Sequence, residues 1–175
     1  MKERGMKDKR IAFGIVIGLG LIADQITKEL VVRRIELFDR IPVISGFFDL
    51  VHYRNTGVAF GLFRDGNTAY TIPFFVTTAI LAVGFLLYFL SHDRSRGLLV
   101  PISLGLIGSG ALGNVIDRIR HGNVVDFLLV YVRTWAWPAF NVADAAICVG
   151  AVLLVLDMFR QSDDGAESGA SPKVG

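Results

Sequence analysis

The sequence predicts an all-α membrane protein, a four-transmembrane-helix bundle that carries a small β-rich external subdomain. The first observation is composition: 53% of the 175 residues are hydrophobic and the mean hydropathy is +0.53, which is too apolar for a soluble domain of this size. The second is that four apolar stretches are long enough to cross a bilayer. The third is a pair of strand-like stretches between those spans.

The four predicted spans are separated by charged or turn-forming segments. They cover residues about 11–32, 68–91, 97–116 and 137–156, and the external segments cover about 33–65 and 117–136. Residues 1–160 are predicted to form a single integral membrane domain, and the Gly-, Ser- and Asp-rich tail 161–175 is predicted to be disordered. The basic leader and first apolar run also resemble a cleavable signal peptide, but Leu21-Ile22-Ala23 is a poor cleavage site and the helical pattern continues to Val32.

Basic residues at the N-terminus predict which side of the membrane the ends occupy. Residues 1–10 carry five basic and two acidic side chains, which favours the cytoplasmic side. With four spans, the C-terminus and the connector 92–96 lie on that side too. Arg33, Arg34 and Arg40, beyond the first span, weaken this charge bias.

The strand-like stretches predict a small sheet at the membrane surface. Residues 47–53 and 124–132 are rich in aromatic and β-branched residues, and glycines flank the first of them. Trp135 and Trp137 suit the interfacial aromatic belt.

Polar residues inside or beside apolar spans are unfavourable unless they are paired or used. Because consecutive spans run in opposite directions, these residues all fall near the outer interface. Pairs spaced i,i+3 or i,i+4 share a helix face and can point into one bundle interior. The residues in question are Asp24, Lys28, Asn114, Asp117, Arg118, Asn141 and Asp144, with Asp126 in the external segment.

Two aspartates that share a site cannot both ionise readily, so one can stay protonated while the other acts as a base on water. That arrangement hydrolyses peptide bonds without a metal or a covalent intermediate. The three histidines have no metal-ligand spacing, and no Gly-x-Ser-x-Gly elbow is present. Structural ion pairs, Asp117 with Arg118 and Asp24 with Lys28, remain an alternative explanation of these charges.

Five motifs in the same order resemble those of the bacterial lipoprotein signal peptidases, the type II signal peptidases. They cover about residues 20 to 145, and Ser109 is a small departure from a more usual glycine. The motifs are Asp24-Gln-x-Thr-Lys28, Asn55-Thr-Gly-Val-Ala-Phe60, Gly110-Ala-Leu-Gly-Asn114-Val-Ile-Asp117-Arg118, Val124-Val-Asp126-Phe127 and Phe140-Asn141-Val-Ala-Asp144.

The resemblance implies an aspartyl endopeptidase of the bacterial inner membrane, with a periplasmic β-rich subdomain and an active site near the periplasmic face. Its substrates would be diacylglyceryl-modified prolipoproteins, cut on the N-terminal side of the lipidated cysteine. Asp126 and Asp144 would be the catalytic dyad, with no metal and no cofactor. Membrane lipid is the other expected partner, and nucleic acid is not expected. Substrate-binding or supporting roles are implied for Asp24, Lys28, Asn55, Gly57, Asn114, Asp117, Arg118 and Asn141.

Two other function classes would also place polar residues in such a bundle. A small proton- or cation-coupled transporter uses intramembrane Asp and Asn, although the confinement of the polar residues to one half and the lack of an internal repeat argue against a through-pathway. A non-catalytic lipid-binding or assembly subunit would explain the bundle and leave Asp126 and Asp144 without a role.

Overall fold

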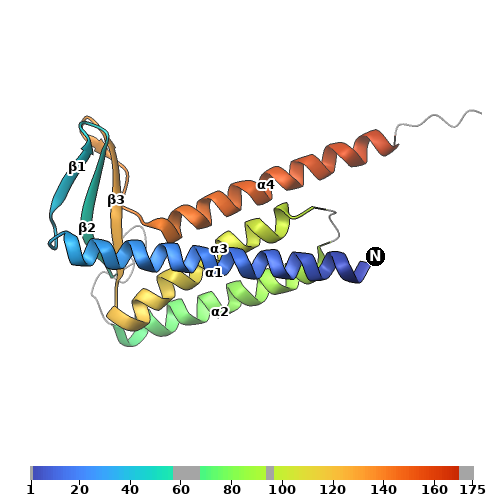
Figure 1. The fold of residues 1–175 in the computed structure, drawn as a ribbon, viewed down its shortest axis with the longest axis horizontal. Coiled ribbons are helices and arrows are strands. Elements are labelled where there is room, and N and C mark those ends of the chain that lie inside the picture. Colours follow the sequence, from blue (N-terminus) through green and yellow to red (C-terminus); the bar gives the residue numbers. More distant parts are fainter. Residues whose placement is uncertain (1, 57–67, 94–96, 170–175) are drawn as a thin grey trace, which may run out of the picture.

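Four long helices and a four-stranded antiparallel sheet make up the fold, and the sheet stands at one end of the bundle (Figure 1). The computed structural model describes residues 2–56, 68–93 and 97–169. This architecture confirms the predicted fold class. The elements are α1 (Lys2–Arg34), β1 (Arg40–Ile44), β2 (Phe48–Asn55), α2 (Thr68–His92), α3 (Leu99–His121), β3 (Val124–Val132), β4 (Trp135–Ala136) and α4 (Val142–Gly169).

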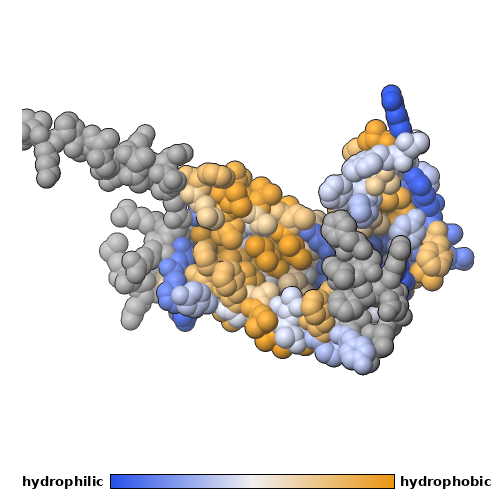
Figure 2. All heavy atoms as spheres, turned by 180° about the vertical axis from the view of Figure 1, so that it is seen from behind, coloured by the Kyte–Doolittle hydropathy of each residue, from blue (hydrophilic) through white to orange (hydrophobic). Residues whose placement is uncertain are grey.

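Each of the four helices contains a stretch long and apolar enough to cross a membrane. Figure 2 shows the corresponding belt of hydrophobic side chains, with hydrophilic residues toward both ends of the molecule. Large apolar side chains on this belt are exposed, such as Leu81 at 68% and Val152 at 58%. Since nothing in the bundle covers them, they face the hydrocarbon of the bilayer.

The third helix, α3, is the centre of the bundle. Half of its span is buried, against 11% to 17% for the other three. Small residues allow the close approach of neighbouring helices. A Cβ at Gly110 would overlap the carbonyl oxygen of Ala143, and a Cβ at Gly150 would lie 2.6 Å from the carbonyl oxygen of Ser103. The backbones of α3 and α4 are therefore in close contact at two positions along the helices, at Gly110 and at Gly150.

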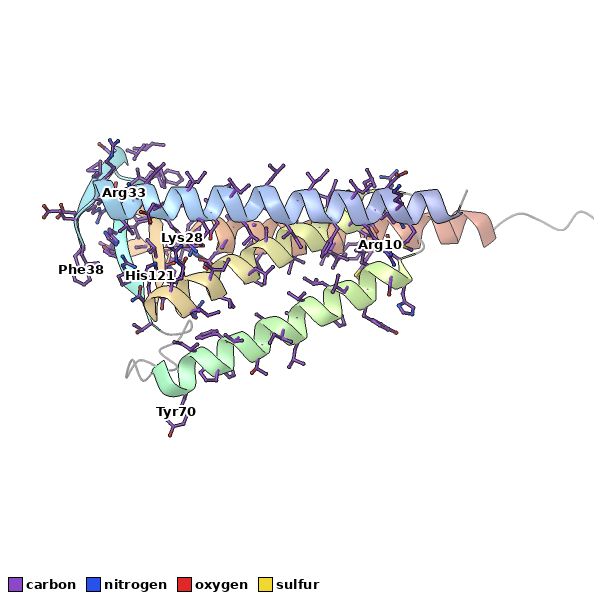
Figure 3. All side chains as sticks on the ribbon, turned by 60° about the horizontal axis from the view of Figure 1, so that its bottom comes forward. Arg10, Lys28, Arg33, Phe38, Tyr70 and His121 are labelled. Carbon is purple, nitrogen blue, oxygen red and sulfur yellow. The ribbon has the colours of Figure 1, made fainter. Side chains whose placement is uncertain are left out.

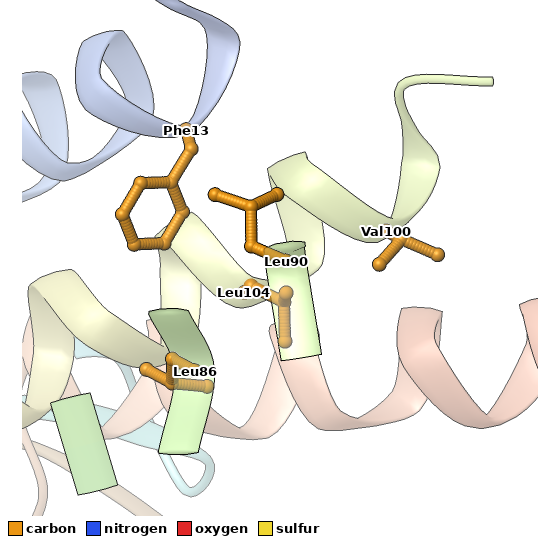
Figure 4. Close-up of a cluster of buried hydrophobic side chains, with 5 residues drawn as sticks. All are labelled: Phe13, Leu86, Leu90, Val100 and Leu104. Carbon is orange, nitrogen blue, oxygen red and sulfur yellow. The ribbon is translucent and has the colours of Figure 1, made fainter. Parts of the chain in front are cut away.

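The end of the bundle away from the sheet is held by an apolar cluster and one ion pair. The cluster contains Phe13, Leu86, Leu90, Val100 and Leu104, contributed by three helices (Figure 4). At the same end, the Nζ atom of Lys9 lies 2.7 Å from the Asp93 carboxylate, and both side chains are buried. These contacts join α1, α2 and the start of α3.

The sheet has the strand order β1-β2-β3-β4 and is fixed to the bundle by a second apolar cluster. Val31 and Ile35, at the end of α1, pack there against Val125 and Phe127 of β3. The register of β2 and β3 pairs Tyr53 with Asp126. Docking of β3 on α1 therefore decides where Asp126 is placed.

The end of α3 and the start of α4 differ from the predicted spans because neighbouring elements supply polar partners. Helix α3 continues past residue 116 to His121, since the polar side chains of its last turns find partners within the bundle. It ends at Gly122, whose left-handed backbone (φ 71°) lets its N–H donate to the Arg118 carbonyl at 2.9 Å. Helix α4 begins at Val142 rather than at 137, because Phe140 is still bridged to Leu128 of β3.

Two further features lie outside the predictions. Helix α4 continues past the predicted span end at 156 to Gly169, because no proline interrupts the backbone before that residue and helical hydrogen bonding runs on beyond the apolar span. Strands β1 and β4 were not predicted. Pro42 within β1 weakens its strand pattern and is accommodated because β1 is an edge strand.

Candidate active site

The predicted site residues that the structure describes converge where the bundle meets the sheet. They come from α1 (Asp24, Lys28), β2 (Asn55), α3 (Asn114, Asp117, Arg118), β3 (Asp126), the residue before α4 (Asn141) and α4 itself (Asp144). Gly57 lies outside the described residues.

Asn141 holds both aspartates of the predicted dyad. Its side-chain Nδ2 donates to Asp126 Oδ1 at 2.9 Å, and its backbone N–H donates to Asp144 Oδ2 at 3.2 Å. In return the backbone N–H of Asp144 donates to Asn141 Oδ1 at 3.0 Å. This reciprocal pair caps the N-terminus of α4, and Asn141 is fully buried. One capping residue therefore fixes the two carboxylates relative to each other.

Each of the four dyad oxygens accepts a hydrogen bond from a nitrogen of an asparagine. Besides the two bonds from Asn141, Asn55 Nδ2 donates to Asp126 Oδ2 at 3.0 Å. Asn114 Nδ2 donates to Asp144 Oδ1 at 2.8 Å. Since every one of these donors is neutral, the carboxylates are oriented without an ion pair of their own.

Burial raises the pKa of Asp126 to about 6. This carboxylate is only 4% exposed, so its charged form loses most of its solvation. Hydrogen bonds from Asn55 and Asn141 and the charge of Lys28 oppose the shift in the pKa, whereas the charge of Asp144 adds to it. Asp126 therefore holds a proton up to a much higher pH than an exposed aspartate does.

Arg118 provides a buried positive charge beside the dyad. Its guanidinium stacks 3.7 Å from the centre of the Phe75 ring and donates from Nη1 to the Asn114 carbonyl at 3.1 Å. It interacts electrostatically with Asp126 and Asp144. The contact also ties α2 to α3 near the site.

Asp24 and Asp117 both form ion pairs with Lys28. The ammonium is 2.9 Å from Asp24 Oδ2 and 3.0 Å from Asp117 Oδ2. The ion pair between Asp24 and Lys28 that the sequence left open is therefore present. The sequence suggested an ion pair between Asp117 and Arg118. In the structure the partner of Asp117 is Lys28, because successive residues of a helix do not face each other.

Sequence reasoning missed two residues of this region. Gln25 donates from Nε2 to Asp117 Oδ1 at 2.9 Å and to Asp24 Oδ2 at 3.2 Å. Its place inside the Asp24-to-Lys28 motif was a signal that was not used. Phe75 carried no signal, since one aromatic residue among many in α2 does not reveal a stacking partner. In the described residues, no group of three His, Cys, Asp or Glu side chains could hold a metal ion.

Comparison with known proteins decides the family. A family model described as signal peptidase (SPase) II matches residues 16–160. The chain belongs to the signal peptidase II family. The lipoprotein signal peptidase of Geobacter sulfurreducens is 47% identical over 152 residues, covering 87% of this chain and 93% of that protein. That of Syntrophus aciditrophicus is 42% identical over 159 residues, covering 91% and 99%.

A solved structure has a similar fold. A bacterial membrane enzyme determined by the in meso method at 2.3 Å resolution matches with a TM-score of 0.76 and 29% identity, covering 87% of this chain and 90% of that one. The predicted function and enzyme class, a lipoprotein signal peptidase of the aspartic type, are confirmed by family membership. A multi-pass membrane protein is likewise confirmed. The transporter and the non-catalytic subunit are thereby set aside.

Proposed function

We propose that Asp126 and Asp144 form the catalytic dyad of this signal peptidase II and hydrolyse a peptide bond through an activated water. The observation that supports this most strongly is that Asn141 bonds both carboxylates while amide nitrogens hold all four of their oxygens. Two acids held this rigidly with one protonated can act as general acid and general base.

In the proposed reaction Asp144 is the base and Asp126 the acid. Asp144 lies in the first turn of α4, where the helix dipole favours negative charge. Asp126 holds its proton because burial raises its pKa to about 6. The water oxygen bonds to the scissile carbonyl carbon, its proton passes to Asp144, and the proton of Asp126 passes to the carbonyl oxygen. When the C–N bond breaks, the nitrogen takes the proton from Asp144 and Asp126 recovers its own.

The proposed substrates are diacylglyceryl-modified prolipoproteins, cleaved on the N-terminal side of the lipidated cysteine. The relatives are named lipoprotein signal peptidases, and the dyad lies at the sheet end of the bundle, on β3 and in the first turn of α4. At that depth, acyl chains of a substrate stay in the hydrocarbon while its peptide bond reaches the dyad.

The activity test is cleavage of a lipidated precursor by the purified protein in detergent or liposomes. Asp126→Asn and Asp144→Asn keep side-chain size and remove the carboxylate. We expect each to insert and bind precursor while its turnover falls ~10²- to 10⁴-fold. Asp157→Asn, which changes a buried aspartate on the same helix as Asp144, is the matched control and keeps its turnover. Substantial turnover by either dyad variant would exclude this mechanism.

We further propose that the protein lies in the bacterial inner membrane with both termini cytoplasmic and the dyad near the periplasmic face. The basic residues of 1–10 support this orientation. In a Cys148→Ser background, a membrane-impermeant thiol reagent should label Asn123→Cys in intact spheroplasts and label His92→Cys only after lysis. The reverse pattern would invert the orientation.

A further inference from the structure

Lys28 is a buried charge that makes three polar contacts within the bundle. The side chain points from α1 into the interior (Figure 3) and is 3% exposed. Its ammonium contacts three oxygens, at 2.9 Å in Asp24, 3.0 Å in Asp117 and 3.0 Å in Asn114. An ammonium has three protons and no acceptor, so each proton has a partner. We call Lys28, Asp24 and Asp117 the Lys28 cluster.

Both carboxylates of the Lys28 cluster also hold backbone beside the dyad. Asp24 Oδ1 accepts the N–H of Ala143 at 3.0 Å, and Asp117 Oδ2 accepts the N–H of Val125 at 3.3 Å. Ala143 immediately precedes Asp144, and Val125 immediately precedes Asp126. One lysine thus links the backbone segments that carry the two aspartates.

The third contact of Lys28 orients an amide of the site. Because the ammonium can only donate, the side chain of Asn114 must turn its Oδ1 toward Lys28. Its Nδ2 then faces Asp144, to which it donates at 2.8 Å. With the amide reversed, a donor would face the ammonium and an acceptor would face the carboxylate. Lys28, together with Asn141 Nδ2, which donates to the same Asn114 oxygen at 3.2 Å, therefore orients the donor that holds Asp144.

From these contacts we infer that the Lys28 cluster positions the catalytic dyad, setting the distance between β3 and α4 and the direction of the Asn114 amide. This rests on the proposed dyad. Lys28, Asp24 and Asp117 are positioning residues, because Lys28 and Asp24 are almost fully buried and none of the three bonds directly to the dyad carboxylates in the described contacts. Among the described residues, the cations that interact electrostatically with the dyad are Lys28, from α1, and Arg118, from α3.

The test variant is Lys28→Met, which keeps the apolar stem and removes the ammonium. Asp24 and Asp117 then face each other without a cation, and their separation displaces Ala143 and Val125. A misplacement of about 1 Å commonly lowers a rate ~10²-fold, so we expect kcat to fall ~10- to 100-fold. KM should stay within about twofold, because the Lys28 side chain is buried. The charge of Lys28 lowers the pKa of Asp126, so its loss raises that pKa. The alkaline limb of the kcat/KM profile should therefore move to higher pH.

The chain offers a matched control at the other end of the bundle. Lys9 is also buried and paired with an aspartate across helices, at 2.7 Å. Lys9→Met should lower the melting temperature and leave both kcat per folded molecule and the pH profile unchanged. If Lys28→Met behaves the same way, with lower stability alone, the positioning role is wrong.

A milder variant keeps the proposal testable if Lys28→Met does not fold. Asp24→Asn preserves size and removes one charge of the cluster, so we expect a smaller loss of kcat with a shifted profile. An unchanged kcat and profile in a folded Asp24→Asn protein would overturn the proposal. The dyad variants separate this outcome from failure of the proposed function: turnover by Asp126→Asn or Asp144→Asn would overturn both, whereas their inactivity leaves the Lys28 result decisive.

Discussion

The two ends of the helical bundle each bury a lysine paired with aspartate, and they use it differently. At the end away from the sheet, Lys9 pairs with Asp93 beside an apolar cluster that supplies the packing. At the sheet end, Lys28 contacts three side chains that lead to β3 and α4. The first lysine closes a connection between helices, whereas the second organises a site.

This difference shows where a membrane bundle can retain charge. Apolar side chains gain nothing from leaving lipid, so helices associate through close packing and polar contacts. The end away from the sheet relies on close packing of α1, α2 and α3. The sheet end keeps a connected set of polar groups whose members satisfy one another, and removal of one leaves others buried and unpaired. Stability should therefore respond to substitutions at both ends, but the catalytic rate only to those at the sheet end.

The largest expected effect on stability comes from the apolar cluster at the end away from the sheet. Leu104 is 1% exposed, and Leu104→Ala leaves a cavity that destabilises the fold by about 2–5 kcal/mol, toward the lower value in lipid because lipid is itself apolar. Thermal unfolding in detergent measures this. The cleavage rate per folded molecule should match that of the unmodified protein. A loss of kcat would show that the catalytic rate also depends on the end away from the sheet.

A smaller loss of stability, combined with a loss of activity, is expected at Gly110. A Cβ there overlaps the Ala143 carbonyl, so Gly110→Ala pushes α4 away from α3 next to the dyad at a cost of about 1–3 kcal/mol. Both the melting temperature and kcat should fall. Gly84→Ala is the control, because nothing lies within 4 Å of a Cβ at Gly84. Equal behaviour of the two variants would mean that this helix contact is not tight.

A change in pH dependence is the next expected effect. The hydrogen bond from Asn55 stabilises ionised Asp126 and lowers its pKa, so Asn55→Ala raises that pKa further above its usual range. Since the acid must be protonated, the alkaline limb of kcat/KM should move to higher pH. Asn123→Ala, which alters an asparagine bonded to Arg54, serves as the control. Movement of the acid limb to higher pH, with the alkaline limb unchanged, would instead make Asp126 the base and reverse the two roles.

The smallest effect is expected from an ion pair at the sheet end that does not belong to the polar network. Arg33 and Glu29 are 2.7 Å apart, but their side chains are 71% and 51% exposed. Solvent screens such a pair, so Arg33→Gln should change neither the melting temperature nor the cleavage rate measurably. A clear loss of activity would show that charge at this end acts beyond the network described above.

The convergence of the polar residues could be predicted from the sequence, because span direction and helical rise place Asp24, Asn114 and Asp144 at one depth. Their individual partners could not. Whether Asp117 faces Arg118 or Lys28 depends on the rotation of α1 against α3, which apolar periodicity does not define to within one side chain. The capping role of Asn141 was hidden for a related reason, since the pairing of Phe140 with β3 delays the start of α4.

The spacing of Asp24 and Lys28 also has a consequence for the order in which the chain is made. The first helix enters the membrane before α3 and α4 exist, and its Asp24 meets the Ala143 N–H only after 119 further positions have been added. Until then, the i,i+4 bond between Asp24 and Lys28 gives α1 a neutral pair within a single helix. The newly inserted helix thus carries its own counter-ion, and Asp117 joins the pair when α3 arrives.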